Sequence, residues 1–315
     1  MFDSRSVHPF AQRSSDSVAS LGEEKLILAI RRWLGSASPR TPFGIGDDCA
    51  VLPASRGRQL ITVDPVIYPR HFDDSVPPRA VGAKLLKRNL SDLAAMGGRP
   101  TAAVLALTLD ARTSVRWLEA FYRGLAACAR AYRVPVVGGD ISQADGLVAA
   151  SLTLLGEASG PRVLTRTGAR RGDFIYVTGQ LGASLTTGHH HNFKPRLAEG
   201  MWLARRSEIT AMMDVSDGLA KDLRSLTPPR TAPALDPAAI PLRPGADLRA
   251  ALTDGEDYEL VFTLASHANP AAFERAWSHA FPRTQLSRLG RFVTADRLPP
   301  GSVQLSEFHG YEHLR

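Results

Sequence analysis

The sequence lacks the features by which several large classes of protein are recognised. No apolar run approaches the roughly 18 residues of a membrane-spanning helix. The two cysteines, Cys49 and Cys128, stand far apart in apolar settings, which excludes a CxxC pair or a zinc-binding pattern. We expect both to be buried, reduced thiols of a cytoplasmic protein. Residues 1–20 are Ser-rich and contain no apolar stretch of the kind that a secretory signal needs, and this segment is the one candidate in the sequence for a disordered piece.

Several sequence motifs of nucleotide chemistry are missing as well. There is no GxxxxGK[ST] loop and no HRD or DFG motif, which excludes P-loop enzymes and protein kinases. The stretch GIGDDC lacks the third glycine of a dinucleotide-binding loop, and Asp47 and Asp48 stand where a pyrophosphate would lie. The three consecutive histidines at 189–191 are interpreted as a soft turn, because only their contiguity suggests a metal site.

The chain is long and basic. Its 315 residues, of which 44% are hydrophobic, predict two domains with sizeable cores. Lys and Arg number 38 against 31 Asp and Glu, a net charge of +7 that favours anionic partners. The basic residues occur in scattered pairs and not in runs, so the sequence gives little support for binding nucleic acid.

Helical and strand patterns alternate along the chain, which predicts an α+β or α/β protein. A capping box of Ser20 and Glu23 is expected to begin a helix that ends near Gly35. Further helices are predicted at 78–96, 113–132, 195–206, 216–226 and 270–281. Strands are predicted at 58–64, 101–109, 134–137, 147–157, 174–179, 209–214 and 257–264, with a short edge strand within 227–245. The Gly, Pro and Arg residues after Glu157 indicate a domain boundary.

Aspartates stand at the ends of apolar runs more often than a basic chain would lead one to expect. Asp64, Asp140 and Asp214 each end such a run, and Asp92 lies inside a predicted helix, where aspartate is a poor helix former. Carboxylates that converge at strand ends need cations to neutralise them, and hard oxygen ligands suit Mg²⁺. These residues therefore predict a site that holds phosphates through metal ions.

Each aspartate also has a structural explanation, and these remain open. Asp214 or Ser216 would serve as the N-cap of the following helix. Asp140 would cap a turn after two glycines, and Asp92 would pair with Arg88, one helical turn earlier.

Taken in order, the motifs resemble those of one family. They are GIGDDCAVL, TVD followed by RHF, NLSDLAAMGGRP, VVGGD, LTRTGARRGDFIYVTG, MMDVSDGLAKDL and GEDYELVFT. Together they resemble the thiamine-monophosphate kinases, which belong to the aminoimidazole-ribonucleotide-synthetase-like ATP-binding proteins. The resemblance extends from about Leu21 to Arg315, and NLSDLAAMG together with GEDYEL is specific.

The resemblance implies a fold and a reaction. Residues 1–157 would form an N-terminal domain that binds ATP and Mg²⁺, with strands that pair across a homodimer into a barrel. Residues 158–315 would form a C-terminal α+β domain. The enzyme would transfer the γ-phosphoryl group of ATP directly to the phosphate of thiamine monophosphate, with several Mg²⁺ ions assisting, and it would have no membrane partner.

The same resemblance implies roles for particular residues. Ligands of the metal ions would be Asp48, Thr62, Asp64, Asp92, Asp140, Asp214 and Asp217. Contacts to ATP would come from Tyr122, Gly139, Asp140, Arg166 and Ser216. Asp140 and Asp217 would act at the reacting phosphate, and the acceptor would be bound by His71, Glu256 and Tyr311. Tyr311 would stack on the cationic thiazolium ring, or would instead cover the core as a C-terminal aromatic.

Some residues depart from the family pattern. In PVIYPRHF, Pro69 and Arg70 replace an acidic-glycine pair that usually precedes the histidine, which affects the acceptor pocket most. One alternative is therefore a paralogue with the same ATP site that acts on another phosphorylated acceptor. A distant alternative, suggested by the charge, is a non-catalytic protein that binds nucleic acid.

Overall fold

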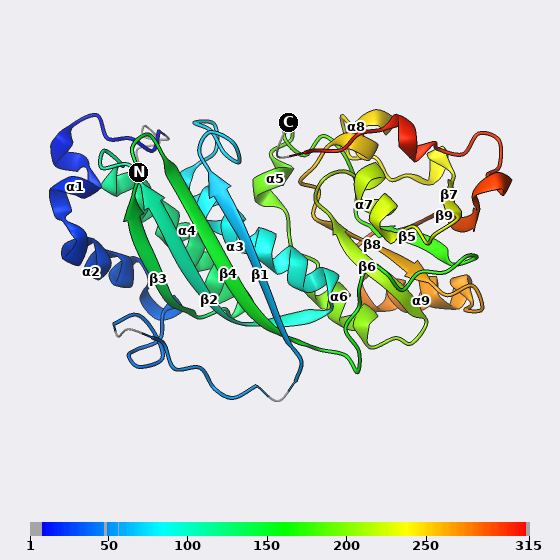
Figure 1. Ribbon diagram of the computed structural model, residues 1–315, viewed down its shortest axis with the longest axis horizontal. Coiled ribbons are helices and arrows are strands. Elements are labelled where there is room, and N and C mark those ends of the chain that lie inside the picture. The colour runs from blue at the N-terminus through cyan, green and yellow to red at the C-terminus, as the bar shows by residue number, and fades with distance from the viewer. Residues whose placement is uncertain (1–7, 47–48, 56, 313–315) are drawn as a thin grey trace. The chain divides into compact units, whose positions relative to one another are not determined.

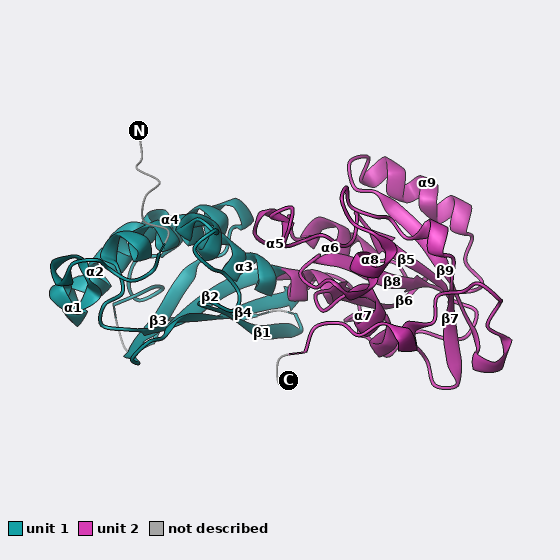
Figure 2. Cartoon of the chain, turned by 90° about the horizontal axis from the view of Figure 1, so that it is seen from above, with its two compact units in different colours: residues 1–90, 100–157 teal, residues 91–99, 158–315 magenta. Residues whose placement is uncertain are grey.

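The computed structural model describes residues 8–46, 49–55 and 57–312 (Figure 1). The chain divides into two compact units (Figure 2). Unit 1 comprises residues 1–90 and 100–157, and unit 2 comprises residues 91–99 and 158–315. Both units mix helices with a sheet, which confirms the predicted α+β class. In the part of the chain that the structure describes, no helix is long and apolar enough to cross a membrane.

Unit 1 is built on a four-stranded sheet with the strand order β1-β4-β2-β3. Its strands are β1 (Gln59–Ile67), β2 (Gly98–Leu109), β3 (Val136–Gln143) and β4 (Val148–Ala158). Its helices are α1 (Val18–Leu21), α2 (Glu23–Leu34), α3 (Pro78–Ala95) and α4 (Val115–Tyr132). β1 runs antiparallel to β4, whereas β2 and β3 are parallel and are joined through α4, as a parallel pair requires.

The helices α3 and α4 lie on one face of this sheet (Figure 2). Their apolar residues recur at helical spacing, so Leu86 and Leu90 of α3 and Leu118 and Leu125 of α4 are all 0% exposed. The other face of the sheet carries exposed apolar side chains. On β1, Ile61 is 72% and Val63 is 60% exposed, whereas the preceding Leu60, which faces the helices, is 8% exposed. Strand alternation thus leaves an apolar surface on the outer face.

Unit 2 contains a five-stranded antiparallel sheet with the order β6-β8-β5-β9-β7. Its strands are β5 (Phe174–Thr178), β6 (Ile209–Val215), β7 (Thr231–Leu235), β8 (Glu259–Leu264) and β9 (Leu286–Thr294). Its helices are α5 (His189–Asn192), α6 (Leu197–Ala204), α7 (Leu219–Leu226), α8 (Leu248–Thr253) and α9 (Pro270–Ala280). Every residue of β8, which pairs with β6 and β5, is buried.

Most predicted elements are present within a few residues, and the exceptions have local causes. The capping box is wrong: Gly22 is the N-cap of α2, and the Ser20 hydroxyl donates to the carbonyls of Ser15 and Ser17 instead. β3 continues through the two glycines beyond its predicted end. A Cβ at Gly139 would lie 2.2 Å from the carbonyl oxygen of Leu105, so glycine allows the close approach of β2.

Two further expectations need correction. Strand β9 was not predicted, because serine, arginine and glycine interrupt its alternation of polar and apolar residues. Cys49 is exposed, whereas Cys128 is buried as expected, and burial raises the pKa of the Cys128 thiol to about 12.

Candidate active site

The end of β6 carries a buried carboxylate. Asp214 is 2% exposed, and its Oδ2 accepts a hydrogen bond of 2.6 Å from the hydroxyl of Ser91. Ser91 and Asp92 are adjacent in the last turns of α3, in the segment that belongs to unit 2. Two motifs more than a hundred residues apart in the sequence therefore meet here, at the point where the resemblance places metal ligands.

The turn between β6 and α7 is held by an aspartate that sequence reasoning missed. Asp222 is 4% exposed, and its Oδ2 accepts hydrogen bonds of 3.0 Å from the backbone amides of both Ser216 and Asp217. Burial raises the pKa of Asp222 to about 7, although the two amides favour the ionised form. The N-cap of α7 is Gly218, without a side-chain cap, so the N-cap explanation for Asp214 or Ser216 is wrong. The signal for Asp222 was an acidic residue on the apolar face of the helix.

Asp217 projects from this turn beside a lysine. The Lys221 ammonium lies 2.8 Å from its carboxylate, and the two side chains are about one-third exposed. Lys221 also donates to the backbone carbonyl of Tyr311, whose own amide donates to the carbonyl of Asp217 at 3.0 Å. The segment that contains Tyr311 therefore lies directly on the turn.

The GEDYEL stretch lies against the same turn. The amide of Glu256 donates to the carbonyl of Ser216, and the amide of Tyr258 donates to the carbonyl of Val215, both at 2.8 Å. Glu256 and Tyr258 have φ angles of 66° and 52°, a left-handed conformation that costs non-glycine residues on the order of 1 kcal/mol each. The surrounding contacts maintain this conformation and place Glu256 beside Ser216.

Arg166 lies near this group as well. It is exposed in the segment that precedes β5, and its positive charge acts to lower the pKa of Asp222. Unit 2 thus gathers, around the turn after β6, the predicted residues Arg166, Asp214, Ser216, Asp217, Glu256 and Tyr311, and Asp92 is next in sequence to Ser91, which contacts Asp214.

Unit 1 does not gather its predicted residues in the same way. Thr62 and Asp64 lie on β1, where the Asp64 carboxylate is 3.2 Å from the guanidinium of Arg88. Asp140 is exposed on β3 and accepts a hydrogen bond of 3.1 Å from Ser142. Because β1 and β3 are opposite edges of the sheet, the strands that carry Asp64 and Asp140 are three strand spacings apart, about 14 Å across the sheet.

The remaining predicted residues have other surroundings. His71 is half-buried: its Nδ1 accepts from the amide of Ile67 at 3.1 Å, and its carbonyl accepts from buried Lys84 at 2.8 Å. The ring of Tyr122 is 3% exposed and packs in the core beside Trp33, and burial strongly raises the pKa of its hydroxyl. Asp48 lies outside the described residues.

The donor set around the turn fits a metal ion that phosphates help to hold. Within residues 8–46, 49–55 and 57–312, no three His, Cys, Asp or Glu side chains are grouped so as to bind a metal by themselves. Magnesium in nucleotide sites, however, is bound through one or two carboxylates, with phosphate oxygens and water completing the shell. Asp214 and Asp217 supply that number, and in this structure the ammonium of Lys221 balances the charge of Asp217.

Comparison with known proteins gives consistent similarities. Residues 46–158 match the family described as AIR synthase related protein, N-terminal domain. The chain is 35% identical over 290 residues to the thiamine-monophosphate kinase of Rhodopirellula baltica, covering 86% of this chain and 89% of that protein. The crystal structure of thiamine-monophosphate kinase from Stenotrophomonas maltophilia K279a is 28% identical, with a TM-score of 0.72 over 85% of this chain and 94% of that one. AaThiL complexed with AMPPCP and TMP is 28% identical, with a TM-score of 0.63 over 97% of this chain and 100% of that one.

Proposed function

The chain belongs to the thiamine-monophosphate kinase family, and we infer that it phosphorylates thiamine monophosphate with ATP to give thiamine diphosphate. The observation that carries this inference is the identity to family members over nearly the whole chain, with the turn after β6 and the GEDYEL stretch in contact. Its cytoplasmic location, where ATP is available, is part of the proposal.

The reaction joins two anions, and the residues around the turn suit that task. The acceptor oxygen is already ionised at neutral pH, so no side chain is needed to remove a proton from it. Arg166 can form paired hydrogen bonds with a phosphate, and Ser216 offers a hydroxyl at the end of β6. We propose that Asp217 and Asp140 act at the reacting phosphate, and that Tyr122, Gly139, Asp140, Arg166 and Ser216 contact ATP.

Magnesium, when bound, would neutralise the phosphates and align the attacking and leaving oxygens. We propose that Asp214 and Asp217 hold it in unit 2. The other proposed ligands are Asp48, Thr62, Asp64, Asp92 and Asp140.

The acceptor differs from ATP in carrying a cationic ring. A carboxylate suits this charge, and Glu256 is the acid of the GEDYEL stretch that keeps some exposure, 22% of its side chain. We propose that Glu256 faces the thiamine moiety together with His71 and Tyr311. The exposed Arg70 beside His71 is the feature that favours the second candidate, another phosphorylated acceptor.

A homodimer is also proposed. The outer face of the unit 1 sheet exposes Ile61 and Val63, and a second copy that covers this face would remove apolar side chains from water. Pairing of the sheets of two copies into a barrel would also allow residues from opposite sheet edges, such as Asp64 and Asp140, to contribute to one site.

The experiment that tests this function is an assay with purified protein, ATP, Mg²⁺ and thiamine monophosphate. We expect thiamine diphosphate and ADP to appear in equal amounts by chromatography, and no product when unphosphorylated thiamine replaces the acceptor. A panel of other phosphorylated acceptors is assayed in parallel. Turnover of one of these, with none of thiamine monophosphate, would establish the second candidate instead.

A further inference from the structure

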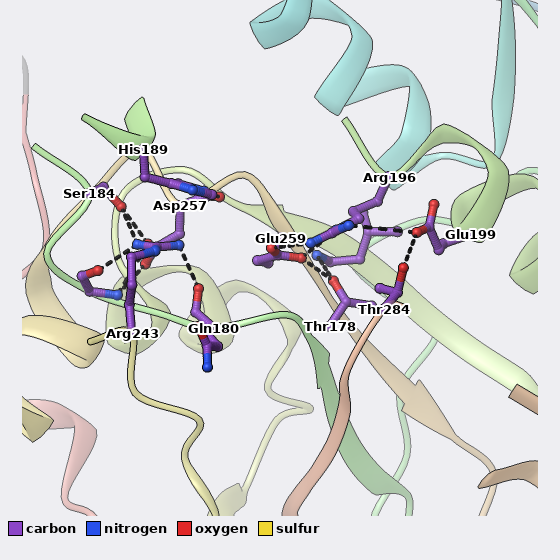
Figure 3. Close-up of polar contacts among 12 residues, drawn as sticks. Thr178, Gln180, Ser184, His189, Arg196, Glu199, Arg243, Asp257, Glu259 and Thr284 are labelled. Atoms are coloured by element: carbon purple, nitrogen blue, oxygen red, sulfur yellow. Dashed lines mark hydrogen bonds and ion pairs between the residues drawn. The ribbon is translucent and has the colours of Figure 1, made fainter. Parts of the chain in front are cut away.

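The acidic side chains of the GEDYEL stretch have different surroundings. Asp257 is 0% exposed and lies 2.7 Å from the guanidinium of Arg243, which also donates to the carbonyl of Gln180 (Figure 3). Glu259 is 2% exposed and receives two hydrogen bonds from Arg196, of 2.7 and 2.6 Å (Figure 3). Both carboxylates are therefore engaged in buried ion pairs, Asp257 with Arg243 and Glu259 with Arg196. Glu256 is the acid of this stretch that remains partly exposed.

The histidine tract is built onto this stretch. It forms the short helix α5 and not the soft turn that the sequence suggested. Nε2 of His189 lies 2.9 Å from the carbonyl oxygen of Asp257, and Nδ1 of His190 lies 3.5 Å from Oε2 of Glu256. Nε2 of His190 is 3.1 Å from Nδ1 of His191, so the imidazole of His190, which is 8% exposed, is held on both sides.

The second oxygen of Glu256 is held from another direction. The hydroxyl of Tyr258 donates to Oε1 of Glu256 at 3.3 Å. The Tyr258 ring is 3% exposed and stacks on Phe193, with ring centres 4.1 Å apart and planes 21° apart. Since the backbone amide of Glu256 is bonded to Ser216, both the main chain and the carboxylate of Glu256 have fixed positions.

We propose that His190 is a positioning residue for the acceptor: with the hydroxyl of Tyr258, it holds the Glu256 carboxylate ready for the cationic ring of thiamine monophosphate. The proposal rests on the proposed function of Glu256. A carboxylate that is fixed before the substrate arrives loses less rotational freedom on binding. The cationic ring is remote from the reacting phosphate, so its contact contributes to binding of the acceptor and its loss should raise KM without lowering kcat.

The test compares two substitutions of one side chain. His190→Leu removes the nitrogen that lies 3.5 Å from Oε2 of Glu256, and we expect it to raise KM for thiamine monophosphate about tenfold, because the carboxylate then loses one of the contacts that fix it before the substrate binds. His190→Gln retains an N–H donor and should recover part of that loss. KM for ATP and kcat should stay at the wild-type values in both variants. The matched control is His279→Gln, an exposed histidine on α9, which should leave every constant unchanged.

A double-mutant cycle identifies the route of the effect. If His190 acts through Glu256, then His190→Leu should change KM for the acceptor little further once Glu256→Gln is present. Equal effects in the two backgrounds would overturn the inference, as would a wild-type KM in His190→Leu. If His190→Leu folds poorly, Tyr258→Phe replaces it in the cycle: this variant removes the hydroxyl that donates to Glu256 and keeps the ring that stacks on Phe193. Its effect on KM for the acceptor should likewise be nonadditive with that of Glu256→Gln.

The outcome is separable from that of the proposed function. Wild-type protein that makes thiamine diphosphate, combined with unaltered KM in the variants, refutes the positioning role alone. If the wild type makes no thiamine diphosphate, the proposed function fails. The contact between His190 and Glu256 is then tested by the urea midpoints of the wild type, His190→Leu, Glu256→Gln and the double variant. Nonadditive midpoints would support the hold of His190 on Glu256, and additive midpoints would overturn it.

Discussion

Asp214 and Asp222 are buried carboxylates on either side of one turn, and different hydrogen-bond donors compensate the loss of solvent around each. Asp214 receives the hydroxyl of Ser91, whereas Asp222 receives two backbone amides. Asp222 therefore shapes the main chain that presents Ser216 and Asp217. Asp214 stands at the meeting point of two distant motifs, which makes it the better placed of the two to serve a ligand.

At the scale of single residues, Asp92 is the sharpest test of the metal proposal. Asp92→Asn keeps the shape of the side chain and removes its charge, so we expect kcat to fall by about a hundredfold or more while the fold persists. Activity is measured with thiamine monophosphate and folding by thermal unfolding. Asp296→Asn, at an exposed position, is the control. Full activity in Asp92→Asn would favour the simple helix-pairing role with Arg88.

His189 gives a prediction about pH. Burial, the dominant cause, lowers its pKa from 6.5 to about 4. The unfolded chain binds a proton at this histidine below about 6.5, whereas the folded chain does so only near 4, so the free energy of unfolding should fall as the pH drops through this window. His189→Asn removes the titration, and its urea midpoint should depend less on pH there. His267→Asn, at an exposed position, should retain the wild-type slope.

At the scale of elements, the β6–α7 turn depends on Asp222. Asp222→Ala leaves two backbone amides without their acceptor, which should lower the free energy of unfolding by about 1–3 kcal/mol and weaken ATP binding. Asp222→Asn retains an acceptor oxygen and should lose less of both. Urea unfolding and calorimetric titration with a nonhydrolysable ATP analogue measure the two effects. Equal losses in both variants would show that charge, and not the hydrogen bonds, is what matters.

The sequence predicts most elements, because apolar spacing in α3, α4 and β8 is strong and regular. It also marks the turn after β6 through Asp214 and Asp217. It does not reveal Asp222 or His190 as partners of that site, because their contacts depend on how the turn, α5 and the GEDYEL stretch pack together. Such tertiary contacts leave no pattern in the local sequence. Strand β9 was missed for a related reason, because its pairing with β5 stabilises a strand whose own sequence pattern is weak.

At the scale of the whole molecule, the outer face of the unit 1 sheet predicts the oligomeric state. Replacing both Ile61 and Val63 by Lys puts charges on the proposed interface and should convert a dimer into a monomer in sedimentation experiments. Leu28→Lys is the matched control, since Leu28 is 58% exposed on α2, away from the sheet. A dimer that survives the double substitution would exclude this face as the interface.

The nine residues from 91 to 99 belong with unit 2 although they are encoded within unit 1. A Cβ on Gly200 would lie 2.1 Å from the carbonyl oxygen of Ala94, so α6 is fitted closely to the end of α3. A fragment that began at residue 158 would forfeit this contact and leave the carboxylate of Asp214 without its serine. We therefore expect shuffling experiments that treat residue 157 as a clean joint to return insoluble C-terminal fragments.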